Sequence, residues 1–130
     1  MKEGSQEWND RVHFAVKKLI DYASTTPYKN KDPYLSYKQF EGLVGLPIDF
    51  INTPQLTPFL RNVCQEIKGS HLTTRDILLS AIVATEGSGI LGPGFFELAK
   101  EIGFTQSELK DKTIFSYEQR KKVFEFYQNI

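Results

Sequence analysis

The chain contains few residues whose types and spacing could support catalysis. Cys64 is the only cysteine, and it falls inside an expected helix, one position from the apolar stripe. A cysteine becomes a nucleophile when a helix N-terminus or a cation lowers its pKa, and nothing near Cys64 in the sequence does so. No ligand-spaced partner accompanies His13 or His71, although zinc needs about four ligands. We therefore interpret Cys64 as structural and predict no metal site and no cofactor.

Paired carboxylates would be the other source of catalysis, as a general acid and a general base. Asp76, Glu86 and Glu97 could converge in space, but their spacing forms no known motif, and we expect them to be solvated. The sequence therefore indicates that the chain is not an enzyme.

The stretch "EGSGILGPG", residues 86–94, is rich in glycine. It has neither the Gly-Lys-Ser/Thr of a P-loop nor the dinucleotide-binding fingerprint. Glycine adopts the positive φ angles of tight turns, so we expect a hairpin tip here. Gly94 precedes an expected helix whose first amides could hold an anion, which is a general property of helix N-termini.

Basic and aromatic residues alternate through the middle of the chain, a combination typical of a nucleic-acid-binding surface. They are Lys29, Lys31, Lys38, Arg61, Lys68 and Arg75, with Tyr28, Tyr34 and Tyr37 between them. A solvated surface with no ligand is the alternative. If this surface binds DNA, we expect contacts from Tyr37, Lys38, Arg61, Lys68, Arg75 and Ser88.

Helical periodicity predicts the elements that position these residues. Apolar residues from Trp8 to Ala23 predict a first helix. Ser36 and Gln39 form a capping box that opens a short second helix, which Gly45 ends. A third helix is expected from about residue 54 to residue 68, with Thr53 as its cap.

The second half of the chain is expected to add a small sheet and two helices. "ILLSAIVA", residues 77–84, is short, apolar and β-branched, which is typical of a strand, and the glycines after it predict a hairpin. "FFELAKEIG", residues 95–103, predicts a helix. A packing helix is expected over residues 116–130, with Tyr117, Val123, Phe124 and Tyr127 facing inward and Arg120, Lys121 and Lys122 facing solvent.

These elements predict one domain over residues 1–130, with residues 1–6 frayed. The fold class is mainly α with a small β-hairpin, in a winged helix-turn-helix-like α+β arrangement. With 130 residues, of which 40% are hydrophobic, the chain can form one core. No apolar run approaches the roughly 20 residues of a membrane span, and a single cysteine fits a reducing compartment. We therefore expect a cytoplasmic protein without a membrane partner.

Two segments resemble the DNA-binding domain of alkylguanine alkyltransferases and of the non-catalytic alkyltransferase-like proteins. "LSYKQFEGLVGLP", residues 35–47, is similar to the segment that opens that domain, and "LLSAIVATEGSG", residues 78–89, is similar to its Pro-Cys-His-Arg strand and wing. The matching positions are Tyr37, Leu43, Gly45, Ile82, Val83 and Gly87. The resemblance spans residues 34–94 and implies a winged-helix domain that binds DNA.

The chain departs from this family at the reactive positions. The family's cysteine, histidine and arginine would fall at Leu79, Ser80 and Ala81. Alkyl transfer needs an activated thiolate, so the resemblance excludes that reaction here. Alkyltransferase-like proteins hold an extruded base with an arginine finger, whereas the matching region here, "FINTPQLTPFL", residues 50–60, carries no charge.

A second resemblance covers most of the chain. "GILGPGFFELAKEIG" and "EQRKKVFEFY" are similar to elements of a loosely defined set of uncharacterised bacterial and phage proteins. That set has no settled activity, so the resemblance implies a fold and no function.

Two hypotheses for function follow. The first is a non-enzymatic domain that binds nucleic acid, with double-stranded DNA expected, through phosphate contacts and insertion into a groove. The alternative is a small regulatory module, possible in a phage, that binds a protein partner. Sixteen basic and 16 acidic residues give zero net charge, which favours the alternative because phosphate neutralisation supplies most non-specific DNA affinity. An exposed patch that includes Tyr28, Tyr34 or Phe50 would also favour it. Neither hypothesis fixes the oligomeric state.

Overall fold

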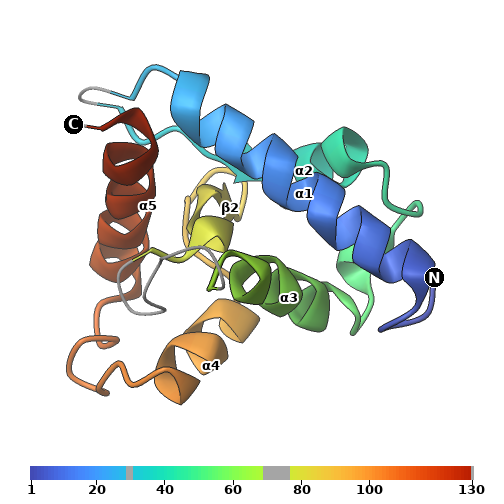
Figure 1. The fold of residues 1–130 in the computed structure, drawn as a ribbon. Helices are drawn as coiled ribbons and strands as arrows, with labels where there is room; N and C mark the ends of the chain where they lie inside the picture. The colour runs from blue at the N-terminus through green and yellow to red at the C-terminus, as the bar shows by residue number, and fades with distance from the viewer. Residues whose placement is uncertain (29–30, 69–76, 130) are drawn as a thin grey trace.

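A computed structural model describes residues 1–28, 31–68 and 77–129, with the side chain of Lys68 outside the description. These residues form a mainly helical structure with a small parallel sheet (Figure 1). The elements in chain order are α1 (Gln6–Thr25), β1 (Leu35–Ser36), α2 (Tyr37–Val44), η1 (Phe50–Asn52), α3 (Leu56–Lys68), η2 (Leu79–Ile82), β2 (Val83–Ala84), α4 (Pro93–Glu101) and α5 (Lys112–Gln128), where η is a 3-10 helix.

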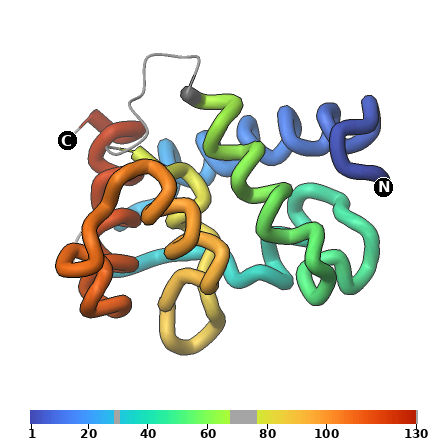
Figure 2. Tube along the Cα trace, turned by 90° about the horizontal axis from the view of Figure 1, so that it is seen from below, coloured from blue at the N-terminus to red at the C-terminus, as the bar shows by residue number. Residues whose placement is uncertain are grey.

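The short helix η2 lies at the centre of the molecule. It contacts α1, α3 and α5, and Figure 1 shows these three helices arranged around it and β2. Viewed from below, α4 and the glycine-rich loop before it lie across the molecule from α1 (Figure 2). Within the described residues, every helix is too short or too polar to cross a bilayer.

The β structure differs from the expected hairpin. β2 pairs with β1 in parallel, with Leu35 opposite Val83 and Ser36 opposite Ala84. The strand expected over residues 77–84 is shortened to two residues, because its first part turns as η2. Residues 78–84 are all buried, and such a run lacks the alternation that separates strands from other buried segments.

The glycine-rich stretch closes as a tight loop over residues 85–90. The Thr85 amide donates to the Ile90 carbonyl at 3.0 Å, and the Gly89 amide donates to the Thr85 carbonyl at 2.8 Å. Side-chain hydroxyls hold the rest of the stretch. The amides of Gly87, Leu91 and Gly92 donate to Tyr34 Oη (3.1 Å), Ser116 Oγ (3.1 Å) and Tyr37 Oη (2.9 Å), respectively.

The capping box of α2 is confirmed. The Gln39 amide donates to Ser36 Oγ at 3.0 Å, and the Ser36 amide donates to Gln39 Oε1 at 2.9 Å. Gly45 ends the helix with a φ of 74°, which is the left-handed conformation that glycine adopts most easily. The structure begins α3 at Leu56, two residues after the predicted start, and Thr53 Oγ1 accepts from the Gln55 amide at 3.3 Å.

Helix α5 starts at Lys112, earlier than expected, because the side chain of Asp111 caps it by accepting from the Ile114 amide at 3.0 Å. The expected orientation of two side chains is wrong: Arg120 is only 2% exposed, whereas Tyr117 is 45% exposed. The buried positions follow helical spacing, but several of them are polar. They are Phe115, Ser116, Gln119, Arg120, Val123 and Phe124.

The buried charge of Arg120 is fully partnered. Its Nε and Nη2 donate to the two carboxylate oxygens of Asp32 at 2.8 and 2.7 Å. Its guanidinium lies 5.2 Å from the centre of the Tyr34 ring, and its Nη1 donates to the Ala81 carbonyl at 3.4 Å. A buried cation is tolerated when it is paired and hydrogen-bonded, so this group joins α5 to the loop before β1.

Candidate ligand pocket

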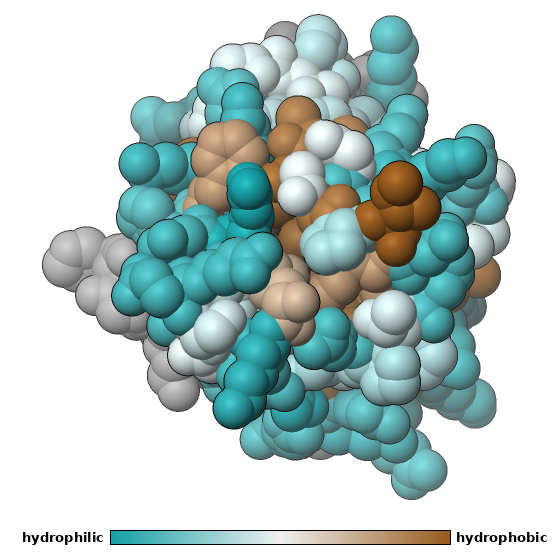
Figure 3. Space-filling view, turned by 90° about the vertical axis from the view of Figure 1, so that its right-hand side faces the viewer, coloured by the Kyte–Doolittle hydropathy of each residue, from teal (hydrophilic) through white to brown (hydrophobic). Residues whose placement is uncertain are grey.

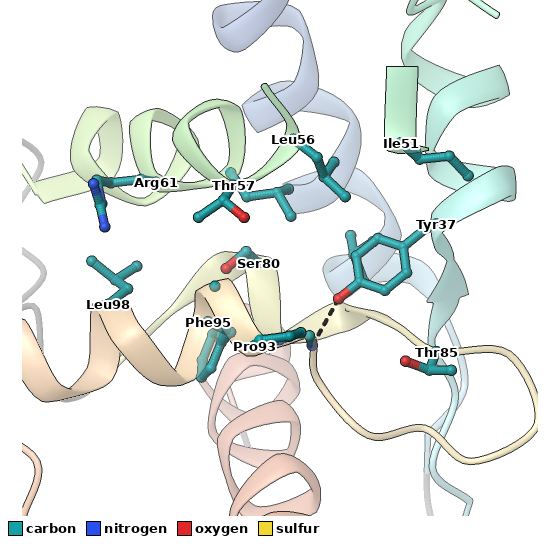
Figure 4. A pocket seen from close by; sticks show the side chains of 14 residues that line it. Tyr37, Ile51, Leu56, Thr57, Arg61, Ser80, Thr85, Pro93, Phe95 and Leu98 are labelled. Carbon is teal, nitrogen blue, oxygen red and sulfur yellow. Dashed lines mark hydrogen bonds between the residues drawn. The ribbon is translucent and has the colours of Figure 1, made fainter. Parts of the chain in front are cut away.

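A cavity of about 220 Å³ lies where α2, α3, β2 and the start of α4 meet (Figure 4). Its wall is largely apolar, formed by Ile51, Leu56, Leu60, Val83, Phe95 and Leu98. Hydroxyl groups of Tyr37, Thr57, Ser80 and Thr85 and the guanidinium of Arg61 add polar atoms to this wall. An apolar cavity with a few converging polar groups is the usual form of a ligand site.

The α3 stripe explains the apolar wall. Phe59 and Val63 take the inward positions and are fully buried, whereas Leu56 and Leu60 are only partly buried. Packing of the inward residues against the core therefore turns the two leucines toward α4, where they line the cavity.

Two glycines allow the start of α4 to approach the other helices. A Cβ atom at Gly94 would lie 2.4 Å from Thr57 Oγ1, and one at Gly92 would lie 2.7 Å from Tyr37 Oη. Both distances are shorter than van der Waals contact, so only glycine fits. The sequence analysis assigned these glycines to turn geometry alone, and their role in close packing was missed.

The hydroxyl of Tyr37 is held at one end of the cavity. It accepts a hydrogen bond from the Gly92 amide at 2.9 Å, drawn as the dashed line in Figure 4. Burial raises the pKa of Tyr37, and the Gly92 bond and the charge of Arg120 offset this only in part. The hydroxyl therefore keeps its proton at neutral pH, and that proton is available for donation to a ligand.

Ser80 connects the cavity to Cys64. The Cys64 Sγ and Ser80 Oγ atoms are 3.2 Å apart. Burial raises the pKa of the Cys64 thiol, although hydrogen bonds from Ser80 and Leu79 oppose the shift. A raised pKa keeps the thiol protonated, which is the reverse of an activated nucleophile.

Arg61 reaches from α3 toward α4 beside Leu98, at the end of the cavity away from Tyr37 (Figure 4). Its Nη2 donates to Glu101 Oε1 at 2.9 Å, and its side chain is 31% exposed. Its Nε is buried and has no hydrogen-bond partner among the described residues. This Nε is the one arginine donor in the described chain found buried without an acceptor.

The structure brings together two of the six residues predicted to contact DNA. Tyr37 and Arg61 both line the cavity. Lys38 is exposed on α2, and Ser88 is exposed in the glycine loop, where its Oγ accepts from the Ile90 amide at 3.2 Å. The other two are not placed: the side chain of Lys68 and the whole of Arg75 lie outside the described residues.

The sequence analysis missed the hydroxyls of Thr57, Ser80 and Thr85. They belong to three separate elements, so no local spacing connects them. His71, Asp76 and Lys29 lie outside the described residues. In the described part of the chain, no three or more His, Cys, Asp or Glu side chains are grouped so that they could hold a metal ion.

Comparisons of the chain with protein-family models, with curated proteins and with solved structures found no match. The pocket is therefore the feature from which a function can be inferred.

Proposed function

We propose that the chain is a non-enzymatic interaction module that receives one apolar side chain of a protein partner in the pocket between α2, α3 and α4. The observation that carries this proposal is the size and chemistry of the cavity. Its volume of about 220 Å³ lies below the roughly 300–1,000 Å³ of pockets for drug-sized ligands. A single side chain suits this volume better than a nucleotide does. Protein interfaces commonly place such an anchor in a desolvated pocket.

The surface beside the pocket supports a protein partner. Ile48 is 90% exposed and comes three positions before Ile51, which lines the cavity. Figure 3 shows apolar and weakly polar residues gathered at the centre of one face, with hydrophilic residues around them. Contiguous exposed apolar surface rimmed by polar residues is typical of an interaction site.

The aromatic patch suggested by the sequence does not supply this surface. Phe50 is only 3% exposed, and Tyr28 stacks on Phe124 with ring centres 5.3 Å apart. Tyr34 lies beneath the guanidinium of Arg120. These aromatic residues therefore stabilise the fold, and the partner is proposed to bind at the pocket.

A titration with N-acetylphenylalaninamide and N-acetylleucinamide, followed by amide chemical shifts, tests the proposal. Saturable shifts are expected at Thr57, Thr85, Gly92 and Gly94. Thr85→Trp should fill the mouth of the pocket and abolish them. Absence of saturable shifts with both probes would remove the proposal.

A matched control comes from the same loop. Ser88→Trp adds the same side chain at an exposed position that does not line the cavity. It should leave the probe-induced shifts unchanged. Equal loss of binding in the two variants would indicate a general disturbance of the loop and would count against the pocket.

One observation favours a second candidate, nucleic-acid binding. Lys38 is exposed and forms no ion pair among the described residues, and the neighbouring Tyr37 holds the glycine loop. In this proposal α2 and α3 form a winged helix-turn-helix-like unit. The chain should then bind a random DNA duplex more weakly at about 200 mM than at about 50 mM salt. Lys38→Glu should weaken binding more than Lys17→Glu does.

A further inference from the structure

We infer that the pocket selects an apolar group that carries a neutral carbonyl oxygen, which accepts a hydrogen bond from Nε of Arg61. This inference rests on the proposed function and specifies the chemistry of the bound group. In a protein partner, the acceptor is a backbone or side-chain amide carbonyl next to the inserted side chain.

The first step is the unused donor of Arg61. A guanidinium has five N–H donors and no acceptor, and here Nη2 is bound to Glu101 at 2.9 Å. The Nε–H is buried and meets no acceptor in the described residues. Buried donors in native proteins nearly always have a partner, and Arg61 lines the cavity. A bound group with an acceptor oxygen would satisfy this donor.

The second step concerns the charge of the acceptor. Glu101 already balances the positive charge of Arg61 through the 2.9 Å ion pair. Glu97 lies one helical turn earlier on α4 and is exposed. A carboxylate ligand would therefore meet the negative charge of Glu101 without an uncompensated cation, since like charges nearby disfavour ionisation. A neutral carbonyl accepts the hydrogen bond without this repulsion.

The third step is the arrangement of the remaining polar atoms. Thr57 and Ser80 lie between Arg61 and Tyr37 in the cavity (Figure 4). Hydroxyls both donate and accept, so they can adjust to the rest of an amide group. The leucines and Leu98 surround these atoms with apolar surface. The cavity thus matches a group that is apolar over most of its surface and has a single strong acceptor.

Three probes that share a phenyl ring on a short stem separate the possibilities: 2-phenylacetamide, phenylacetate and ethylbenzene. The neutral amide is expected to bind about tenfold more tightly than ethylbenzene, which corresponds to one hydrogen bond to a charged group. Phenylacetate is expected to bind more weakly than the amide. Dissociation constants come from the amide shifts of Gly92 and Gly94.

Two variants locate the effect at Arg61. Arg61→Met keeps the apolar stem but has no Nε–H, so it should bind ethylbenzene normally and lose the preference for the amide. Glu101→Gln keeps Nε–H and leaves the guanidinium charge unbalanced, so phenylacetate should gain affinity relative to the amide. Thermal unfolding of both variants checks that they are folded.

The outcomes distinguish this inference from the function on which it rests. Binding of ethylbenzene with no preference for the amide, or a preference that survives in Arg61→Met, would overturn the inference and leave the apolar pocket standing. If none of the three probes binds at the pocket, both the inference and the proposed function are wrong. Loss of the preference only in Arg61→Met would establish the role of Nε.

Discussion

At the scale of single residues, Arg120 and Asp32 form an unequal pair. The Arg120 side chain is 2% exposed and that of Asp32 is 35% exposed. If the carboxylate is removed, the cation remains buried without its partner. If the cation is removed, the carboxylate can still reach water. The cost of breaking a buried ion pair comes largely from the charge that is left behind.

Asp32→Ala is therefore expected to lower the free energy of unfolding by about 3 kcal/mol, and Arg120→Met by less. Urea unfolding measures both. The double variant should be less destabilised than the sum of the single variants, because the two residues interact directly. A larger loss in Arg120→Met than in Asp32→Ala would contradict this account.

Cys64 provides a prediction about pH. Burial raises its pKa in the folded chain, so the folded chain holds this proton more tightly than the unfolded chain does. Its contribution to stability is present below the unfolded pKa of about 8.5 and is lost as pH rises through the folded pKa. Iodoacetamide at about pH 8 should alkylate Cys64 more slowly in the folded protein than in urea. Stability should also fall less steeply above about pH 8.5 in Cys64→Ala.

Gln119 is a second buried polar residue of α5, only 3% exposed. Its Oε1 is buried and has no hydrogen-bond partner among the described residues. Gln119→Met replaces the amide with an apolar group of similar length. This change should raise the free energy of unfolding by about 1 kcal/mol, because an unsatisfied buried acceptor carries a desolvation cost. Unchanged or lower stability in urea unfolding would argue against it.

At the scale of elements, local signals were sufficient for the early helices and insufficient for the centre of the molecule. The capping box at Ser36 and the left-handed Gly45 are set by neighbouring residues, so the sequence predicted them. Residues 77–84 are enclosed on all sides, and an apolar run without alternation does not distinguish a strand from a buried turn. The parallel pairing of β1 with β2 depends on residues 48 positions apart (Leu35 with Val83), which no local pattern encodes.

The faces of α5 were misjudged for a different reason. Arg120 was expected to face solvent because arginine is seldom buried. Its position is three residues before Val123 and four before Phe124, both of which are buried, so spacing alone would have placed it inside. For the pocket, the sequence supplied Tyr37 and Arg61, but as residues of a DNA-binding surface. The hydroxyls between them come from separate elements and needed the fold.

Close packing of α4 against α3 predicts opposite effects for one substitution at two helical glycines. Gly94→Ala would place a Cβ atom 2.4 Å from Thr57 Oγ1, and it should lower the free energy of unfolding by about 1–3 kcal/mol through overpacking. At Gly42 of α2 an added Cβ meets nothing within 4 Å. Gly42→Ala should raise stability by about 1 kcal/mol, because alanine favours helix.

Thermal and urea unfolding of the two variants measure the contrast. Thr57→Ala removes the atom nearest to the added Cβ, and should recover part of the stability lost in Gly94→Ala. If both glycine variants shift stability in the same direction, α4 does not pack against α3 as closely as described.

At the scale of the whole molecule, the buried residues form one cluster. It extends from Trp8 in α1 to Phe124 in α5 and includes η2, which contacts three helices. The chain should therefore unfold in a single cooperative transition. Trp8 is the only tryptophan and is fully buried, so its fluorescence reports on the core. Urea curves from Trp8 fluorescence and from far-ultraviolet circular dichroism should coincide, and separated curves would reveal two independent units.

The glycine-rich stretch has a different relation to this cooperative unit. The amides of Gly87, Leu91 and Gly92 are bound by hydroxyls of tyrosine and serine side chains and not by a neighbouring strand. Rotation of one side chain can release such an amide to solvent while the helices stay intact. Its proton should exchange with deuterium through small local openings. The amide of Val63, in the buried α3 helix, has no such route, and its proton is retained until the whole chain opens.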